Sequence, residues 1–379
     1  MQRAPIGENP HPAGFLLYKG SFPKGVTVAT KLKVGLVGCG GISKVHLDGW
    51  KKLNPDCQVV ALCDILEAPL KARGEQYEVP TSQRYLDHRD LLRHADIDAV
   101  DVCVPNMAHA EITINGLKAG KHVICEKPLA PTPAEIRRMI AARDRAGKLL
   151  MTAQHQRFER SSQNLKNYLT TGALGEVYYA RAHFLRRRYI PGWGGGSFID
   201  KKRSGGGPCI DIGVHILDLA LHLMGHPEPV VVTGITPCKL GKRKDIRGWW
   251  GEWNRDKMSV EDFAAGFVRF KNGGALSLEV SWLLNIHEPE YQRIVLCGTE
   301  AGAEWPAMTV HGEKAGNVTD IKLSFPDDRA DGHHTELAEF ASAIFHKKPS
   351  PVPPEQSLNV MRILDGLYRS NATGREVKV

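Results

Sequence analysis

From residue 32 to about residue 155, short apolar runs alternate with segments that have a helical pattern of apolar positions. The expected strands are Leu32–Val37, Gln58–Cys63, Ala99–Val104, His122–Cys125 and Leu149–Ala153. The helices expected between them include Ile42–Lys52, Ala108–Ala119 and Pro133–Ala146. Strands that alternate with helices in this way predict βαβ units and a parallel sheet.

The pattern changes after about residue 155, where strand-like runs follow one another without intervening helices. The expected strands are Glu176–Leu185, Val230–Thr236, Phe263–Phe270, Ala275–Leu283 and Arg293–Leu296, and Asn272-Gly273 is a hairpin signal. Two helices are expected near the end of the chain, at Glu336–Phe345 and Ser357–Ser370. Successive strands predict an antiparallel sheet, so this second region is expected to be an α+β domain.

The composition is that of an ordinary globular protein of 379 residues, with 42% hydrophobic and 24% charged residues. No apolar run approaches membrane-spanning length, and residues 1–30 lack the layout of a secretory signal, so we expect an N-terminal extension or arm and no membrane partner. The eight cysteines include no Cys-x-x-Cys pair, which favours a reduced, cytoplasmic setting. The net charge of +8 comes from short basic runs beside glycine-rich loops, without the basic face that nucleic-acid binding requires.

A glycine-rich turn, Gly38-Cys39-Gly40-Gly41-Ile42-Ser43, follows the first expected strand and opens the first expected helix. Gly38 permits a tight turn, and Gly40 lets the backbone approach a pyrophosphate that the helix N-terminus then binds together with Gly41 and Ile42. Asp64 ends the next strand, where a carboxylate accepts hydrogen bonds from a ribose hydroxyl and repels a 2′-phosphate. These residues predict a dinucleotide-binding domain that prefers NAD to NADP.

Polar residues follow two later strands of the same region. Pro105, Asn106 and His109 come after one strand, and Glu126 and Lys127 come directly after another. Ligands of open α/β sheets lie at the carboxyl ends of the strands, so we expect these residues around the cofactor and Lys127 beside its nicotinamide.

A glycine triplet, residues 205–207, precedes an apolar helical segment interrupted by Asp211, His215, Asp218 and His222. Their spacing of four, three and four residues places all of them on one stripe of a helix. A solvated helix face usually carries lysine, glutamate, glutamine or arginine, so this stripe favours the wall of a site. Metal binding is the competing interpretation, but no His-Glu-x-x-His pattern and no cysteine accompany the stripe, and we expect no metal.

Aromatic residues in two loops are candidates for stacking against a sugar ring. Tyr189 and Trp193 lie in one glycine-rich segment, and Trp249-Trp250 lies in another. Packing within loops or between subunits explains them equally well. Arg157, soon after the last strand of the first domain, is a further candidate for contact with substrate.

The chain resembles the Gfo/Idh/MocA family, named after glucose–fructose oxidoreductase, inositol dehydrogenase and a rhizopine-catabolism protein. The resemblance covers nearly everything after residue 31. It rests on the glycine turn, Val104-Pro105-Asn106 with His109, the segment from Gly120 to Ala130 that contains Glu126-Lys127-Pro128, the segment from Gly206 to Asp211 and His215, and the tail ending at Thr373-Gly374. It implies a Rossmann domain at residues 31–155 and a substrate-binding and oligomerisation domain at residues 156–379, with an open-faced, largely antiparallel sheet. It also implies that Lys127, Asp211 and His215 are the catalytic set.

The expected activity is hydride transfer from a secondary hydroxyl of a sugar, glycoside or cyclic polyol to NAD. His215 would act as the general base and Lys127 would stabilise the developing alkoxide, while Asp211 would orient the imidazole or bind the substrate. Two alternatives remain open: an NAD-dependent glycosidase that oxidises its sugar transiently, and a non-catalytic regulator that binds NAD.

A homo-oligomer, either a dimer or a homotetramer, is expected to form through the second sheet. In Ala275–Leu283, one face carries Leu276, Leu278, Val280 and Trp282. The other face mixes Ala275 and Leu283 with Ser277, Glu279 and Ser281. A mixed face of this kind suits a subunit interface better than open water.

Overall fold

The structure is a computed structural model of the chain, and it describes residues 31–192, 196–325 and 331–379. The expected N-terminal extension, residues 1–30, and the candidate substrate residue Trp193 lie outside the described residues.

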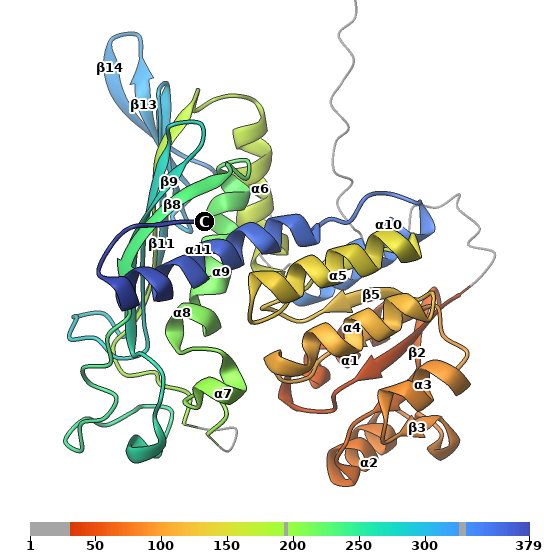
Figure 1. Cartoon of the computed structure of the whole chain (residues 1–379). Helices are drawn as coiled ribbons and strands as arrows, with labels where there is room; N and C mark the ends of the chain where they lie inside the picture. The colour runs from red at the N-terminus through yellow and green to blue at the C-terminus, as the bar shows by residue number, and fades with distance from the viewer. Residues whose placement is uncertain (1–30, 193–195, 326–330) are drawn as a thin grey trace, which may run out of the picture.

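The first domain is built on a six-stranded parallel sheet (Figure 1). Its strands are β1 (Leu32–Val37), β2 (Cys57–Cys63), β3 (Arg84–Tyr85), β4 (Ala99–Val102), β5 (His122–Cys125) and β6 (Leu150–Thr152). Its helices are α1 (Gly41–Lys52), α2 (Glu67–Gln76), α3 (His88–His94), α4 (His109–Lys118) and α5 (Pro133–Ala146), with single 3-10 turns η1 (Thr81–Gln83), η2 (Asn106–Ala108) and η3 (His155–Phe158). The strand order β3-β2-β1-β4-β5-β6 is that of the Rossmann fold, which confirms the expected fold of this domain.

The second domain contains a nine-stranded sheet in the order β14-β13-β12-β11-β7-β10-β9-β8-β15. Its strands are β7 (Val177–Arg186), β8 (Pro229–Ile235), β9 (Phe263–Phe270), β10 (Ala275–Ser281), β11 (Glu290–Gly298), β12 (Ala301–Trp305), β13 (Thr309–Lys314), β14 (Asn317–Lys322) and β15 (Val377–Lys378). Its helical segments are α6 (Arg160–Thr170), α7 (Lys201–Ser204), α8 (Pro208–Asp211), α9 (Gly213–Leu223), η4 (Arg255–Lys257), α10 (Gly332–Phe345) and α11 (Pro354–Thr373). The pairing of β7 with β10 is parallel and the other strand pairs are antiparallel, so the sheet is largely antiparallel as expected.

The helices α6, α9 and α11 lie on the same side of this sheet (Figure 1). The side chains of β10 that face them, and Trp282 just beyond the strand, are buried: Leu276, Leu278, Val280 and Trp282. Ser277 and Glu279 on the other face are partly exposed, as expected. Ser281 and Leu283 are fully buried instead, because the chain leaves the sheet there and Ser281 Oγ bonds the backbone of Arg186.

The C-terminal helices join the two domains. Helix α10 packs on α1 of the first domain, where the ring of Phe340 meets Trp50 edge-on at 6.4 Å. Helix α11 contacts both α5 and the second sheet, and Thr152 Oγ1 lies 2.8 Å from Ser357 Oγ. Residues 332–345, which the division at residue 156 assigns to the second domain, therefore pack on the first.

All eight cysteines are free. No helix in the described part of the chain is long and apolar enough to cross a membrane.

Candidate active site

The glycine turn has the geometry that a bound pyrophosphate requires. Gly38 has a φ of +99°, and a Cβ there would lie 2.3 Å from the carbonyl oxygen of Cys103, so only glycine fits. A Cβ on Gly40 or Gly41 would meet nothing within 4 Å, which leaves open space beside the backbone. Helix α1 begins here without a side-chain cap and without an acidic residue in its first turn. Its N–H groups are therefore available to a phosphate, and the turn fits a dinucleotide.

Asp64 lies beside this turn, directly after β2. Its Oδ2 accepts a hydrogen bond of 2.7 Å from the N–H of Cys39, and its Oδ1 accepts one of 2.8 Å from Leu66. Ile65 and Leu66 next to it are largely exposed, at 84% and 60%. A fixed carboxylate with apolar neighbours at this point suits the ribose and adenine of NAD.

Asn106 and His109 hold loops at the same sheet edge. Asn106 Nδ2 donates to the carbonyl oxygen of Ser204 at 2.8 Å and so connects the first domain to α7. His109 is fully buried, with its two ring nitrogens 2.7 and 2.8 Å from the carbonyl oxygens of Pro128 and Val104. Both residues thus shape the edge where the cofactor is expected.

Lys127 and Asp211 meet across the boundary between the domains. Lys127 follows β5, and its Nζ lies 3.1 Å from the carbonyl oxygen and 3.4 Å from Oδ1 of Asp211 at the end of α8. Trp282 Nε1 donates to the other carboxylate oxygen of Asp211 at 3.2 Å. The carboxylate therefore orients the ammonium, and it contacts Trp282 rather than the imidazole of His215.

The glycine triplet sets the start of α8. The N–H groups of Gly207 and Cys209 donate to Glu261 Oε1, which also accepts a hydrogen bond from the hydroxyl of Tyr368. A Cβ on Gly206 would lie 2.0 Å from the Tyr368 hydroxyl oxygen, and one on Gly207 would lie 2.2 Å from the Glu261 carbonyl oxygen. The glycines allow this close packing and so fix the position of the acid at the end of α8.

His215 lies in the first turn of α9 and is only 8% exposed. Its Nδ1 is buried and has no hydrogen-bond partner among the described residues. Burial, followed by the positive charge of Lys127, holds the pKa of His215 well below its usual value. The imidazole is therefore neutral at pH 7, the form that can accept a proton from a hydroxyl.

The expected stripe of four residues divides into two parts, because the helix breaks at Ile212 between α8 and α9. Asp218 forms a buried two-bond pair with Arg157, with both N–O distances at 2.6 Å. The Arg157 guanidinium is 2% exposed and bonds Gln356 as well. The structure thus places Arg157 and Asp218 in a buried ion pair between η3 and α9. His222 lies one turn beyond Asp218, on the same helix.

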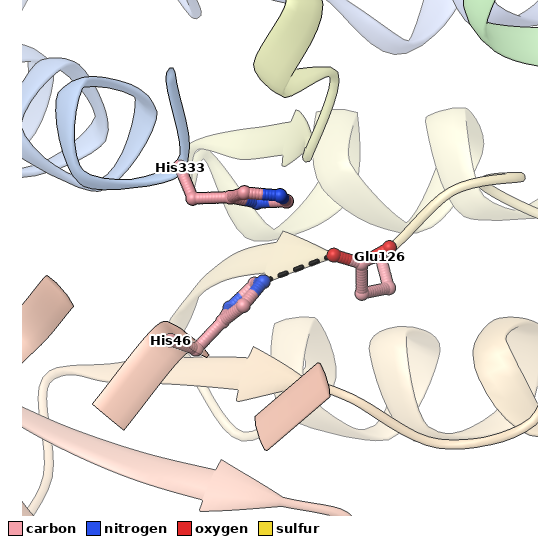
Figure 2. A group of neighbouring side chains, drawn as sticks. All are labelled: His46, Glu126 and His333. Atoms are coloured by element: carbon pink, nitrogen blue, oxygen red, sulfur yellow. Dashed lines mark hydrogen bonds and ion pairs between the residues drawn. The ribbon is translucent and has the colours of Figure 1, made fainter. Parts of the chain in front are cut away.

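A buried network supports Lys127 from the side of the first domain. His46 on α1 has Nδ1 2.9 Å from Asp101 Oδ2 and Nε2 2.9 Å from Glu126 Oε1 (Figure 2). Glu126 Oε2 in turn accepts a hydrogen bond from the N–H of Lys127 at 3.0 Å. Burial opposes a charge on His46, but the Asp101 carboxylate raises its pKa well above the usual value. Burial would likewise raise the pKa of Glu126, but the hydrogen bond from His46 brings it down to about 2.

The ligand-type atoms of His46, Glu126 and His333 lie within 4.8 Å of one another, as they would around a metal ion (Figure 2). A charged imidazole, however, donates from both nitrogens and has no lone pair for a metal. The hydrogen bonds to Asp101 and Glu126 account for both nitrogens of His46. The arrangement is that of a cation held between two carboxylates.

Two histidines near His215, and a buried glutamine next to one of them in the sequence, were not expected from the sequence. The ring of His155 lies 5.1 Å from that of His215, and the ring of His333, from α10, stacks on His155 at 3.9 Å. Gln154 is buried with no hydrogen-bond partner found for its Oε1 in the described structure. Gln154 and His155 come after β6, separated from it by Ala153 alone, and this position near a strand end was the signal available in the sequence. The sequence around His333 offered no such signal, because α10 comes from a distant part of the chain.

Comparison with known proteins agrees with this geometry. Residues 32–154 match a family model described as an oxidoreductase family with an NAD-binding Rossmann fold, and residues 166–379 match the C-terminal alpha/beta domain of the same family. D-glucoside 3-dehydrogenase of Escherichia coli (strain K12) is 35% identical over 94% of this chain and all of the relative. Levoglucosan dehydrogenase of Pseudarthrobacter phenanthrenivorans is 29% identical over 79% of this chain and 78% of the relative.

A solved structure of an aldose-aldose oxidoreductase from Caulobacter crescentus, complexed with glycerol, is 25% identical and superposes with a TM-score of 0.75 over 92% of this chain and all of that one. A levoglucosan dehydrogenase in complex with NADH and levoglucosan has the same fold, with a TM-score of 0.78 at 23% identity over 92% of this chain and all of that one. The chain therefore belongs to the Gfo/Idh/MocA family of NAD-binding oxidoreductases.

Proposed function

We propose that this protein is an NAD-dependent dehydrogenase that oxidises a secondary ring hydroxyl of a glucoside, at C3. The observation that carries the proposal is the contact of Lys127 with Asp211 beside the neutral, buried His215. The 35% identity to a D-glucoside 3-dehydrogenase over 94% of the chain supports a glucoside and its C3 hydroxyl. A sugar or polyol substrate agrees with the other relatives, which include a myo-inositol 2-dehydrogenase.

The reaction converts a secondary alcohol and NAD⁺ into a ketone, NADH and a proton. When bound, NAD supplies the hydride acceptor, and the protein supplies alignment and proton transfer. His215 takes the hydroxyl proton while hydride leaves the same carbon, because the neutral imidazole is the base present in the site. The Lys127 ammonium donates a hydrogen bond to the same oxygen and stabilises the developing negative charge.

Asp211 acts in this mechanism as the residue that positions Lys127. Its carboxylate contacts the ammonium at 3.4 Å and is itself held by Trp282. This role replaces the expectation that Asp211 orients the imidazole, since the hydrogen-bond partners of its carboxylate in the structure are Lys127 and Trp282.

The test is a panel of purified substrates assayed for NADH formation: methyl glucosides of both anomers, free glucose, levoglucosan and myo-inositol. The proposal expects the highest kcat/KM for a glucoside, with a 3-keto sugar as product. Preference for the cyclitol or the anhydrosugar, or oxidation at another carbon, would overturn the assignment of substrate.

The assembly that we propose is a homo-oligomer, a dimer or tetramer formed through the second sheet. Phe267 and Ile235 expose 39% and 53% of their surface on the face of the sheet opposite to α9 and α11. Apolar groups on a broad, otherwise mixed face favour burial against another copy. Light scattering should report a multiple of 41.8 kDa, and a fully active monomer would contradict this interface. The free cysteines, six of them buried, support a cytoplasmic location.

A further inference from the structure

Three aromatic rings gather where the chain leaves β7. The ring of Tyr189 lies 5.2 Å from Trp249 and 5.0 Å from Trp250. Trp249 and Trp250 are 50% and 37% exposed. The N–H of Trp249 donates to the carbonyl oxygen of Arg188 at 2.8 Å, so the loop is tied to the end of the strand. Adjacent exposed rings held in place in this way are typical of a binding surface.

Strand register connects these rings to the catalytic groups. The parallel pairing of β10 with β7 aligns Ser281 with Leu185, so the next residues, Trp282 and Arg186, are neighbours on the helix-covered face. Trp282 is the residue that donates to the carboxylate of Asp211. Arg186 therefore lies one side chain away from the group that positions the catalytic lysine.

Arg186 also contacts one of the three aromatic rings. Its guanidinium carbon lies 4.6 Å from the centre of the Trp250 ring, and its Nε bonds Glu290 at 2.6 Å. The arginine is thus held against the tryptophan by a fixed ion pair. Its charge is among those that lower the pKa of His215, after burial and nearer charges, which agrees with its place beside the site.

We propose that Tyr189, Trp249 and Trp250 form a subsite for the second ring of a glycoside, the ring attached through the glycosidic oxygen to the sugar being oxidised. This inference rests on the proposed function and narrows its substrate class to glycosides with a ring aglycone. The apolar face of a pyranose or aryl ring packs well on an exposed tryptophan, and Tyr189 and Arg186 provide polar contacts at the edge. The sugar being oxidised would lie between this subsite and Lys127.

There is space for such a group beyond the rings. The segment that carries Trp250 continues into the wall of a pocket of about 1050 Å³, lined by Trp253 and Lys257 on one side and by α7 on the other. Helix α7 is also the helix bonded to Asn106 at the cofactor edge. In this segment the lining of the pocket begins at Glu252, two residues after Trp250, so a hollow large enough for a ring and its substituents lies next to the subsite along the chain.

The experiment compares Trp250→Ala and Trp249→Ala with the wild-type enzyme on methyl β-glucoside, phenyl β-glucoside and cellobiose. A ring bound equally in the ground and transition states changes KM and leaves kcat nearly constant. We expect KM for phenyl β-glucoside or cellobiose to rise by roughly 5- to 10-fold, while methyl β-glucoside changes less than about 2-fold. If KM rises for only one of phenyl β-glucoside and cellobiose, that substrate identifies the bound ring as aryl or sugar.

Tyr178→Ala is the matched control. Tyr178 is 52% exposed and lies on the same face of β7 as Arg186, but near the other end of the strand. The variant should leave KM for all three substrates unchanged. Three results would each overturn the subsite: an equal rise in KM for methyl β-glucoside, an unchanged KM for all substrates, or a change of oligomeric size in Trp250→Ala. Failure of wild-type enzyme to oxidise any glucoside would instead overturn the proposed function, and the subsite with it.

Discussion

The proposed catalytic groups come from both domains. Lys127 follows β5 of the first domain, whereas Asp211 and His215 come from helices α8 and α9 of the second. Burial keeps His215 neutral, and the Asp211 carboxylate accepts hydrogen bonds from Lys127 and Trp282. At this scale, the residue types and their order were predictable, but the partner of each side chain was not.

Lys127→Ala and His215→Ala should each lower turnover by at least ~10²-fold, because they remove the groups that act on the alkoxide and the proton. Asp211→Asn should have an intermediate effect, since it weakens the positioning of Lys127. Steady-state kinetics and NAD titration by fluorescence separate turnover from cofactor binding, which should change much less. His222→Gln, on the same helix but beyond the ion pair of Asp218, should retain nearly full turnover. Near-normal turnover in His215→Ala would remove that residue from the mechanism.

His155 makes the folded state sensitive to acid. Burial, followed by the charge of His333, lowers its pKa to about 3, whereas the unfolded chain titrates near 6.5. The unfolded state therefore binds a proton that the folded state does not, and stability is lost as the pH falls below 6.5. One such group lowers the free energy of unfolding by up to about 2 kcal/mol between pH 7 and pH 5.

His155→Phe keeps a ring against His215 and His333 but cannot titrate. Denaturant unfolding gives the free energy of unfolding at pH 7 and at pH 5. The decrease between the two pH values should be smaller in the variant than in the wild type by about 1 to 2 kcal/mol. Parallel losses in the two proteins would mean that His155 is not held neutral.

Among the elements, α1, β4 and β5 are joined by His46. It lies between Asp101 and Glu126 inside the first domain, and its removal would leave two buried carboxylates without their shared donor. Removing one partner of such a group costs about 3–5 kcal/mol. His46→Ala should reduce the free energy of unfolding by that amount, as measured by denaturant titration. Lys44→Ala, in an exposed pair on the same helix, should cost less than about 1 kcal/mol. Equally small losses of unfolding free energy in the two variants would contradict the stabilising role of the His46 network.

We expect the end of β2 to determine whether the protein prefers NAD or NADP. Asp64 is fixed by two backbone N–H groups, and we propose that its carboxylate binds the adenosine ribose. Asp64→Ser should weaken NAD binding roughly 10-fold and relax discrimination against NADP, because a charge-assisted bond and a repulsive charge are both lost. Glu67→Ala, nearby in the first turn of α2, is the control and should change neither dissociation constant. Tighter binding of NADP than NAD by the wild type would contradict the assignment.

Elements with strong apolar periodicity were predictable from the sequence, and polar ones were not. The limits of β1, β5, β9 and α5 agree with those expected, because apolar runs or cap residues such as Thr132 and Gly147 define them. Strands β12 to β14 were missed, and for β14 the reason is that most of its positions are exposed and show no alternation. Helix α2 was missed for the same reason, with Leu70 and Gly74 its only buried residues.

At the scale of the whole molecule, the site depends on how the end of the chain folds back. Helix α10 brings His333 to the first domain, and α11 spans both domains. Sequence patterns located the glycine turn of the first domain and singled out Asp211 and His215 in the second, because a glycine triplet precedes them. They could not locate His155 and His333 beside His215, since these contacts bring together η3, α9 and α10, which lie far apart in the sequence.

The most direct test of the central claim is the transfer of label from a glucoside deuterated at C3. Purified protein is mixed with NAD⁺ and the labelled glucoside, and the reduced cofactor, keto sugar and free aglycone are measured by mass spectrometry. The account predicts reduced cofactor that carries one deuterium, in equal amount to a 3-keto glucoside, without release of aglycone. Unlabelled reduced cofactor, release of aglycone with no net NADH, or NAD binding without any turnover would contradict it.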